Sequence, residues 1–176
     1  MSDLERVEFA GRVFRVVSFD LDDRLGKRHR YEVIRHPGAA AIVPWLPDGR
    51  VLLIQQPRPA VGRRLLEIPA GTLDPAEDAE TCARRELEEE TGFRASEWRR
   101  LAAFYPSPGI LDERMWLFEA RGLSPGQTDP DADEDITNVP LDPANVAALV
   151  AAGEIADAKT LVGLAMAGIP VGVPGW

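Results

Sequence analysis

The sequence predicts an α/β (α+β) fold in which helices flank a mixed β-sheet. Strand-like segments fill the first 56 residues, one helix-like segment follows, and two further strand-like segments precede two closing helices. Because each face of a sheet must be covered by another layer, this order favours a sandwich of helices around the sheet. The chain has 176 residues, of which 45% are apolar, and this is enough for one sizeable core.

The first 36 residues are expected to form a small antiparallel β region ahead of a main domain at residues 37–176. Residues 7–17 alternate apolar and polar side chains, and residues 31–36 show a similar pattern. Two apolar runs then open the main domain at residues 39–46 and 51–56. A Pro-Asp-Gly turn signal separates them, so they are predicted to pair as a hairpin.

The segment between the second apolar run and the long helix is predicted to be mostly loop. Residues 57–70 contain three prolines and lack a helical period, with a short extended piece at residues 65–68. The helix is expected to start at Asp74 or Pro75, with acidic residues in its first turns as the helix dipole favours, and to stop before Gly92.

The rest of the chain supplies the second group of strands and the closing helices. Strands are expected at residues 98–105 and 115–120, followed by a polar, acidic loop at residues 121–135. Helices are expected at residues 143–152 and 158–167, and no internal repeat or long linker divides the chain further.

Charge and cysteine content narrow the class of partner. The net charge is -9, with 29 acidic against 20 basic residues, which argues against nucleic acid as a partner. A small anionic substrate is still compatible, since a bound metal can invert the local field. The single cysteine, Cys82, allows no intramolecular disulfide, so a reducing, cytoplasmic location is expected, with Cys82 as a small buried apolar residue.

No membrane association is expected. The N-terminal residues lack the basic and apolar regions of a signal peptide. The apolar stretch at residues 161–175 is too short, and too interrupted by glycine and proline, to span a bilayer.

The helix that ends before Gly92 carries three carboxylates within one turn. Glu86 and Glu90 are four residues apart and share a face, with Glu89 beside them, while Glu88 is expected to project into water. Partly buried like charges are costly unless they are paired or bound to a metal, and hard oxygen ligands suit Mg²⁺ or Mn²⁺. The alternative is an ordinary solvated, glutamate-rich helix.

The full spacing around this turn matches the pattern G-x5-E-x7-R-E-U-x-E-E-x-G-U, in which U is a bulky apolar residue, and so resembles the Nudix box. The matching positions are Gly71, Glu77, Arg85, Glu86, Leu87, Glu89, Glu90, Gly92 and Phe93. Phe93 departs slightly from the family, which more often has an aliphatic residue there. The resemblance implies a Nudix-type α/β/α sandwich and hydrolysis of a nucleoside diphosphate linked to another group.

The resemblance also implies a set of metal ligands. Glu86 and Glu90 correspond to direct ligands, Glu89 lies close to the metals, and the main-chain carbonyl of Ala70 is a further ligand. Arg85 is grouped with the catalytic residues because its guanidinium can hold one of these carboxylates in place. The glycine that opens the box is expected to permit a backbone geometry that a Cβ would hinder.

Three features outside the box resemble the ADP-ribose pyrophosphatase group of this family. Ser107, Pro108 and Gly109, with Glu113, match its S-P-G-x-x-x-E loop. The lead-in to the box places Arg58 where it would contact phosphate, and a guanidinium fork suits a diphosphate. Each feature also has a structural explanation, as an ordinary turn or a surface charge.

The third feature is the acidic loop, in which Glu134 matches a glutamate that enters the site and handles the metal-bound water. The simpler explanation is a solvated flexible loop. The general base is therefore open between Glu89, Glu113 and Glu134, since a base must lie within about 3 Å of the attacking water.

The same group is commonly a homodimer whose N-terminal strands exchange between subunits. Arg30 and Glu32 match residues of an R-Y-E segment that contact the adenosine half of the substrate, although a cross-strand ion pair explains them equally well. The sequence thus predicts metal-dependent hydrolysis of ADP-ribose to AMP and ribose 5-phosphate. The alternatives are a Nudix hydrolase of another nucleotide sugar or dinucleotide, and a non-catalytic nucleotide-binding module.

Overall fold

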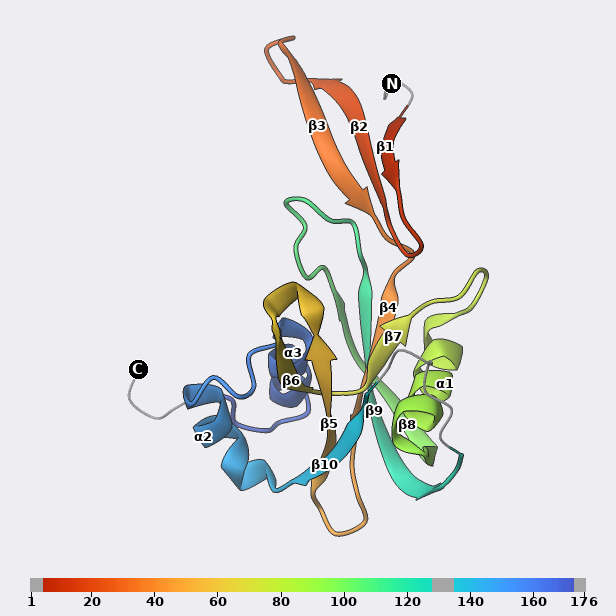
Figure 1. Ribbon diagram of the computed structural model, residues 1–176, viewed down its shortest axis with the longest axis vertical. Coiled ribbons are helices and arrows are strands. Elements are labelled where there is room, and N and C mark those ends of the chain that lie inside the picture. Colours follow the sequence, from red (N-terminus) through yellow and green to blue (C-terminus); the bar gives the residue numbers. More distant parts are fainter. Residues whose placement is uncertain (1–4, 128–134, 173–176) are drawn as a thin grey trace.

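The computed structural model describes residues 5–127 and 135–172, which form three β-sheets with helices packed beside them (Figure 1). In chain order the described elements are β1 (Arg6–Ala10), β2 (Arg15–Asp22), β3 (Arg28–Arg35), β4 (Ala39–Pro44), β5 (Val51–Arg58), η1 (Pro59–Val61), β6 (Arg63–Glu67), β7 (Ala70–Thr72), α1 (Ala79–Thr91), β8 (Phe93–Phe104), β9 (Met115–Pro125), β10 (Thr137–Leu141), η2 (Pro143–Asn145), α2 (Val146–Ala151) and α3 (Ala158–Met166). The mixed α/β class expected from the sequence is confirmed.

The N-terminal sheet, in the order β1-β2-β3, is antiparallel and projects away from the other two sheets (Figure 1). The single alternating run expected at residues 7–17 is instead two strands. The main-chain N–H of Gly11 donates to the carbonyl of Phe14 at 2.9 Å, which closes the turn between them. A period-two pattern does not reveal where the chain reverses, because both strands of a hairpin share it.

Strand β4 is the centre of the mixed sheet, whose order is β7-β4-β9-β8. It runs parallel to β9 and antiparallel to β7, and all of its residues are buried. Ala40 and Ile42 pack toward α1, while Ala41 and Val43 belong to the larger core on the other face. A strand covered on both faces is continuously apolar, which explains the run at residues 39–46.

The hairpin predicted between the two apolar runs is wrong. Strand β5 lies in a different sheet, in the order β10-β5-β6, and one isolated bridge between Trp45 and Val51 joins the two runs. Both edges of β4 are already occupied by β7 and β9, so β5 cannot pair along it. The two strands nevertheless contribute to one core, through Val43 and Leu53.

Several segments expected as loops are strands. The extended piece expected at residues 65–68 is largely confirmed as the end of β6, and the prolines at residues 57–70 separate it from η1 and β7 rather than exclude structure. Strand β9 continues to Pro125, into the segment expected as a polar loop, because β8 pairs with it as far as Phe93 opposite Pro125. Strand β10 lies at a sheet edge, where Pro140 can stand without a main-chain donor. Asn138 donates its side-chain N–H to the carbonyl of Thr91 at 2.8 Å.

The helices follow the sequence more closely, except at one end. The two closing helices agree with η2, α2 and α3, and Gly92 ends α1 in the left-handed conformation, with φ of 74°. Helix α1, however, begins four or five residues later than expected. Asp74 and Glu77 form a turn, and the carboxylate of Asp78 caps the helix by accepting from the main-chain N–H groups of Glu80 and Thr81. No helix in the described ranges is long and apolar enough to cross a membrane.

The position of the helix start can be tested with a pair of matched variants. Asp78→Ala is expected to lower the midpoint of thermal unfolding by roughly 2–4 °C, since it removes the acceptor of two main-chain N–H groups. Asp74→Ala is expected to change the midpoint much less. Calorimetric scans of the two variants and the parent protein compare them, and a larger loss from Asp74→Ala would contradict the cap.

Candidate active site

The loop and helix of the box are built around Arg85. Its guanidinium donates from Nε and Nη2 to the two oxygens of Glu77, at 3.0 and 2.9 Å. Nη1 donates to Glu86 at 2.7 Å and to Glu89 at 2.9 Å, and Nη2 also reaches the carbonyl of Thr72 at 3.2 Å. Glu77 and Glu86 raise the pKa of Arg85 further, while Arg85 lowers the pKa of Glu77. One cation therefore orients three box carboxylates and fixes them to the strand that precedes the helix.

Glu90 connects the helix to the same strand from a second position. It is a buried carboxylate, 5% exposed, and its Oε2 accepts the main-chain N–H of Ala70 at 2.9 Å. This contact brings the Ala70 peptide against a carboxylate of α1. The inward face of the helix is otherwise apolar, with Cys82 and Leu87 fully buried. Burial raises the pKa of the Cys82 thiol to about 12, so this cysteine is an unreactive core residue.

Gly71 is required by contact rather than by backbone conformation. Its φ is not positive, but a Cβ at this position would overlap the carboxylate of Glu86. The structure gives this glycine a different reason from the expected backbone geometry, because the group that a Cβ would displace is the Glu86 carboxylate. The expectation for Glu88 is wrong. Its carboxylate accepts from Arg94 at 2.7 Å and from the main-chain N–H of Gln127 instead of facing open water.

Two cavities meet at this segment. The larger, of about 710 Å³, is lined by Arg58, Arg85, Glu86, Glu89 and the segment from Ala70 to Pro75, with Arg12 and Val13 from the N-terminal sheet. The smaller, of about 290 Å³, shares Arg58 and Ala70–Thr72 and adds Glu113, Asp157 and Lys159. A ligand that crosses the Ala70–Thr72 segment would therefore lie near the carboxylates of α1 in the larger cavity and near Lys159 in the smaller one, with Arg58 lining both.

The fold brings together only part of the set of predicted substrate contacts. Arg58 and Glu113 line the cavities, but Arg58 is held by a bidentate ion pair to Glu67, at 2.9 and 2.8 Å. Gly109 lines a separate cavity of about 260 Å³ beside β3, and the carbonyl of Ser107 accepts from two main-chain N–H groups in its own turn. Glu134 lies outside the described residues.

Arg30 and Glu32 lie on β3 and line none of these cavities within the described parts of the chain. Arg30 donates to Glu8 at 2.8 Å and to Ser18 at 3.0 Å, and its Nε lies 3.8 Å from Glu32. Within one chain, Arg30 forms a cross-strand ion pair with Glu8 of β1, while its contact with Glu32 lies along β3 itself.

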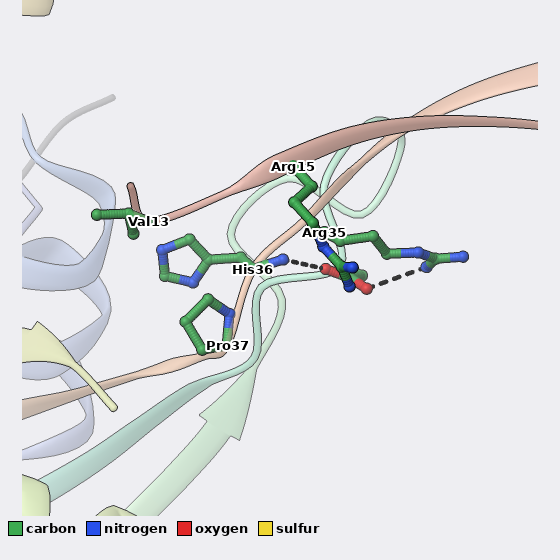
Figure 2. Close-up of a pocket in the computed structure, with 6 residues that line it drawn as sticks. Val13, Arg15, Arg35, His36 and Pro37 are labelled. Carbon is green, nitrogen blue, oxygen red and sulfur yellow. Dashed lines mark hydrogen bonds and ion pairs between the residues drawn. The ribbon is translucent and has the colours of Figure 1, made fainter. Parts of the chain in front are cut away.

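A carboxylate and main-chain hydrogen bonds hold the joint between the N-terminal sheet and the site. Ile34 exchanges main-chain hydrogen bonds with Ile110 and Asp112. The guanidinium of Arg35 and the main-chain N–H of His36, both drawn in Figure 2, donate to the carboxylate of Asp112. The two distances are 3.0 and 2.8 Å. The His36 ring accepts from the N–H of Gly38 at 3.1 Å through Nδ1, which also lies 3.9 Å from Glu113. The turn after β3 thus fixes the positions of the N-terminal sheet and of the Glu113 loop relative to β4.

The donor set at the box is suited to a hard divalent cation. Glu86, Glu89, Glu90 and the Ala70 peptide supply only oxygen ligands, which Mg²⁺ and Mn²⁺ prefer. Among the residues that the structure describes, no three acidic, histidine or cysteine side chains already form a metal cluster. Arg85 holds Glu86 and Glu89 at 2.7 and 2.9 Å, through one oxygen of each carboxylate. A metal would therefore share these carboxylates with Arg85.

Sequence reasoning missed three residues: Asp157 and Lys159, which line the smaller cavity, and Glu67, which pairs with Lys159. Glu67 is 1% exposed, and it accepts from both Arg58 and Lys159, whose Nζ also donates to Asp157 at 2.9 Å. The signal for Glu67 was a charged residue inside the apolar run Leu-Leu-Glu-Ile-Pro. The sequence signal for Lys159 was weaker: it is one of only two lysines in the chain. Nothing local indicated that the closing helix would reach the box.

Comparison with known proteins agrees with this geometry. The NUDIX domain family matches residues 35–161. An ADP-ribose pyrophosphatase of Bacillus subtilis (strain 168) is 38% identical over 156 residues, covering 86% of this chain and 83% of that protein. A GDP-mannose pyrophosphatase of Enterobacter sp. (strain 638) is 34% identical over 165 residues, covering 85% and 84%. A crystal structure of an ADP compounds hydrolase superposes with a TM-score of 0.84 at 25% identity, covering 96% of this chain and 91% of that one.

The α/β sandwich with a glycine-led loop and an acidic helix thus defines a hydrolase of the type that acts with divalent metal. The chain belongs to the Nudix family.

The contact at Gly71 gives a structural prediction. Gly71→Ala is expected to displace the Glu86 carboxylate, while the free energy of unfolding changes by no more than about 1 kcal/mol, because the obstructing group is the end of a flexible side chain. A crystal structure and urea unfolding measure the two effects. Gly172→Ala, which meets no neighbour, is the control. An unmoved Glu86 in the Gly71 variant would contradict the contact.

Proposed function

We propose that this protein hydrolyses the diphosphate bond of ADP-ribose to give AMP and ribose 5-phosphate, with Mg²⁺ or Mn²⁺ as cofactor. The observation that carries the proposal is the wall shared by the two cavities: Arg58 lines the larger cavity together with Glu86 and Glu89, and it also lines the smaller one. A diphosphate needs cationic contacts along its length, and a metal held by carboxylates with a guanidinium beside it supplies them. The Bacillus relative, named for ADP-ribose, supports this choice of substrate.

The metal would be held by Glu86, Glu90 and the carbonyl of Ala70, with Glu89 beside them. When bound, it neutralises charge on the phosphate oxygens and lowers the pKa of the attacking water. The chain's own contribution is to keep these ligands in place. Arg85 holds Glu86 and Glu89, and the N–H of Ala70 holds Glu90, so the ligand set is organised before substrate arrives.

The attacking water needs a proton acceptor, and two described glutamates are candidates. Glu89 already accepts from Arg85 at 2.9 Å, whereas Glu113 lines the smaller cavity beside Ala70. We therefore assign the base to Glu113, which also stands on a loop and can approach after binding. Glu134, the remaining sequence candidate, stays a prediction.

A second candidate activity is the hydrolysis of another nucleotide sugar. The Enterobacter relative at 34% identity is named for GDP-mannose, and the residues of the shared wall contact phosphate rather than a base or sugar. The residues of the wall therefore support hydrolysis of a diphosphate, and the choice of ADP-ribose as substrate is supported by the Bacillus relative.

The activity is tested by incubating the purified protein with ADP-ribose and Mg²⁺ and measuring AMP by liquid chromatography. Glu86→Gln and Glu90→Gln are each expected to reduce kcat by roughly 100-fold or more, since a neutral amide is a poor ligand for a hard cation. Both variants should remain folded by circular dichroism.

Glu80→Gln is the matched control, because Glu80 lies on the same helix but pairs with Arg84 at the surface. The Glu80→Gln variant should retain activity. Parallel reactions with GDP-mannose show which of the two nucleotide sugars the protein hydrolyses. Turnover of GDP-mannose without AMP from ADP-ribose would reject the substrate, and undiminished turnover in both acidic-ligand variants would reject the metal assignment.

We further propose that residues 1–36 form a dimerisation region, so that Arg30 and Glu32 serve the adenosine side of a partner's site. The support is the number of apolar side chains that the N-terminal sheet exposes, among them Phe9 at 54% and Tyr31 at 45%. Exposed apolar surface of this extent is typical of an interaction site.

Light scattering is expected to give twice the 19.3 kDa mass of one chain. The double variant Val7→Ser, Phe9→Ser should shift the equilibrium toward monomer, because both side chains are more than half exposed in the single chain. Met166→Ser, an exposed apolar residue on α3, is the control. A monomeric parent protein at all concentrations would refute the proposal.

A further inference from the structure

A buried carboxylate holds two cations on the wall of the smaller cavity. Glu67 is 1% exposed, accepts from Nε and Nη2 of Arg58 at 2.9 and 2.8 Å, and also accepts from Nζ of Lys159. Burial on its own would raise the pKa of Glu67, but the hydrogen bond from Arg58 and the charge of Lys159 outweigh it, so the pKa lies below its ordinary value. The three groups are therefore a charged cluster at neutral pH.

The position of Lys159 is fixed by the start of α3. Asp157 caps this helix by accepting from the main-chain N–H of Thr160 at 3.0 Å and from its hydroxyl at 2.7 Å, and it accepts from Lys159 at 2.9 Å. The Thr160 oxygen in turn accepts the main-chain N–H of Ile68 at 3.0 Å. The first turn of α3 is thereby tied to the residue that follows Glu67, and Lys159 has little freedom to leave the cavity wall.

This rigid lysine retains a donor for a ligand. An ammonium group carries three N–H donors, and the described contacts of Lys159 are to the two carboxylates of Glu67 and Asp157. Lys159 lines the cavity with Arg58, Ala70 and Glu113 and is 11% exposed, so an anion in that cavity would lie within its reach.

The choice of a lysine here stands out against the rest of the chain. Of the 20 basic residues, 18 are arginines, and the other lysine, Lys27, lies in an exposed turn between β2 and β3. A compact ammonium suits a confined position that must serve two carboxylates and still point at a ligand, whereas a guanidinium is planar and needs more room. Lysine is a common phosphate ligand that acts as a point charge.

We propose that Lys159 is a phosphate-binding residue of this site, which together with Arg58 contacts the diphosphate from the side of Ala70–Thr72 away from α1, and that Glu67 positions both cations. The inference deepens the proposed function, on which it rests only in requiring a ligand with a diphosphate group. The competing explanation is that Lys159 does no more than join α3 to the sheet through ion pairs.

Lysine labelling of the unaltered protein separates these explanations. The protein is acetylated with a limiting amount of an amine-reactive reagent, in the presence and in the absence of methylenediphosphonate and Mg²⁺. Mass spectrometry then measures the rate of acetylation at each lysine. Methylenediphosphonate is a diphosphate analogue that cannot be hydrolysed. Labelling of Lys159 is expected to slow at least about 5-fold with the analogue, while Lys27 is an internal control that should not change. Equal rates at Lys159 in both conditions would overturn the proposal.

Substitution gives a second measurement. Lys159→Met is expected to weaken binding of methylenediphosphonate with Mg²⁺ by roughly 10-fold or more in calorimetry, since a charged hydrogen bond is lost. Lys159→Arg should recover part of the affinity, and Lys27→Met should bind as the parent protein does. Parent-like affinity in a folded Lys159→Met protein would contradict the assignment. If that variant does not fold, the labelling result decides.

Neither measurement depends on turnover, so the two proposals fail separately. Protection of Lys159 without AMP formation from ADP-ribose would leave the phosphate contact standing and reject the substrate. AMP formation from ADP-ribose without protection of Lys159 would support the substrate and reject the phosphate contact.

Discussion

The arrangement of the site depends on pairing several carboxylates that would otherwise repel one another. Glu77, Glu86 and Glu89 converge on the guanidinium of Arg85, and Glu90 is held by the N–H of Ala70. Without these partners, a partly buried cluster of like charge would be costly. The sequence spacing of the box can be understood as the spacing that lets one arginine and one strand satisfy four acids. A metal then adds to an arrangement that the protein already stabilises.

The sheet explains why this pairing occurs at the cavity. Strand β4 is buried on both faces and holds β7 along one edge, so Ala70–Thr72 is fixed relative to α1, which packs on the same sheet through Cys82, Ala83 and Leu87. Gly71 completes the approach, because the space where its Cβ would stand is filled by Glu86. The rigid core thus sets the distance between the loop and the helix that carry the chemistry.

Beside the Ala70–Thr72 segment, in the smaller cavity, a second group of charges is paired in the same way but with opposite signs. Here one buried acid, Glu67, holds two cations, Arg58 and Lys159. Arg58 comes from a strand before the box, and Lys159 from a helix after it, 92 residues beyond Glu67. Local patterns indicated the first, since it stands in a recognisable lead-in. They could not indicate the second, because its partner is distant in the chain.

By itself, the sequence determined the features that depend on local spacing: the acidic turn of α1, its end at Gly92, the buried character of β4 and the two closing helices. Periodicity and glycine chemistry act over a few residues, so a single chain displays them. Only the tertiary structure decided which strands pair, that β4 and β5 lie in different sheets, that α1 starts at Ala79 behind its Asp78 cap, and that Lys159 meets Glu67. Those outcomes depend on which edges and charges remain available after the rest of the chain has packed, and no local pattern records that competition.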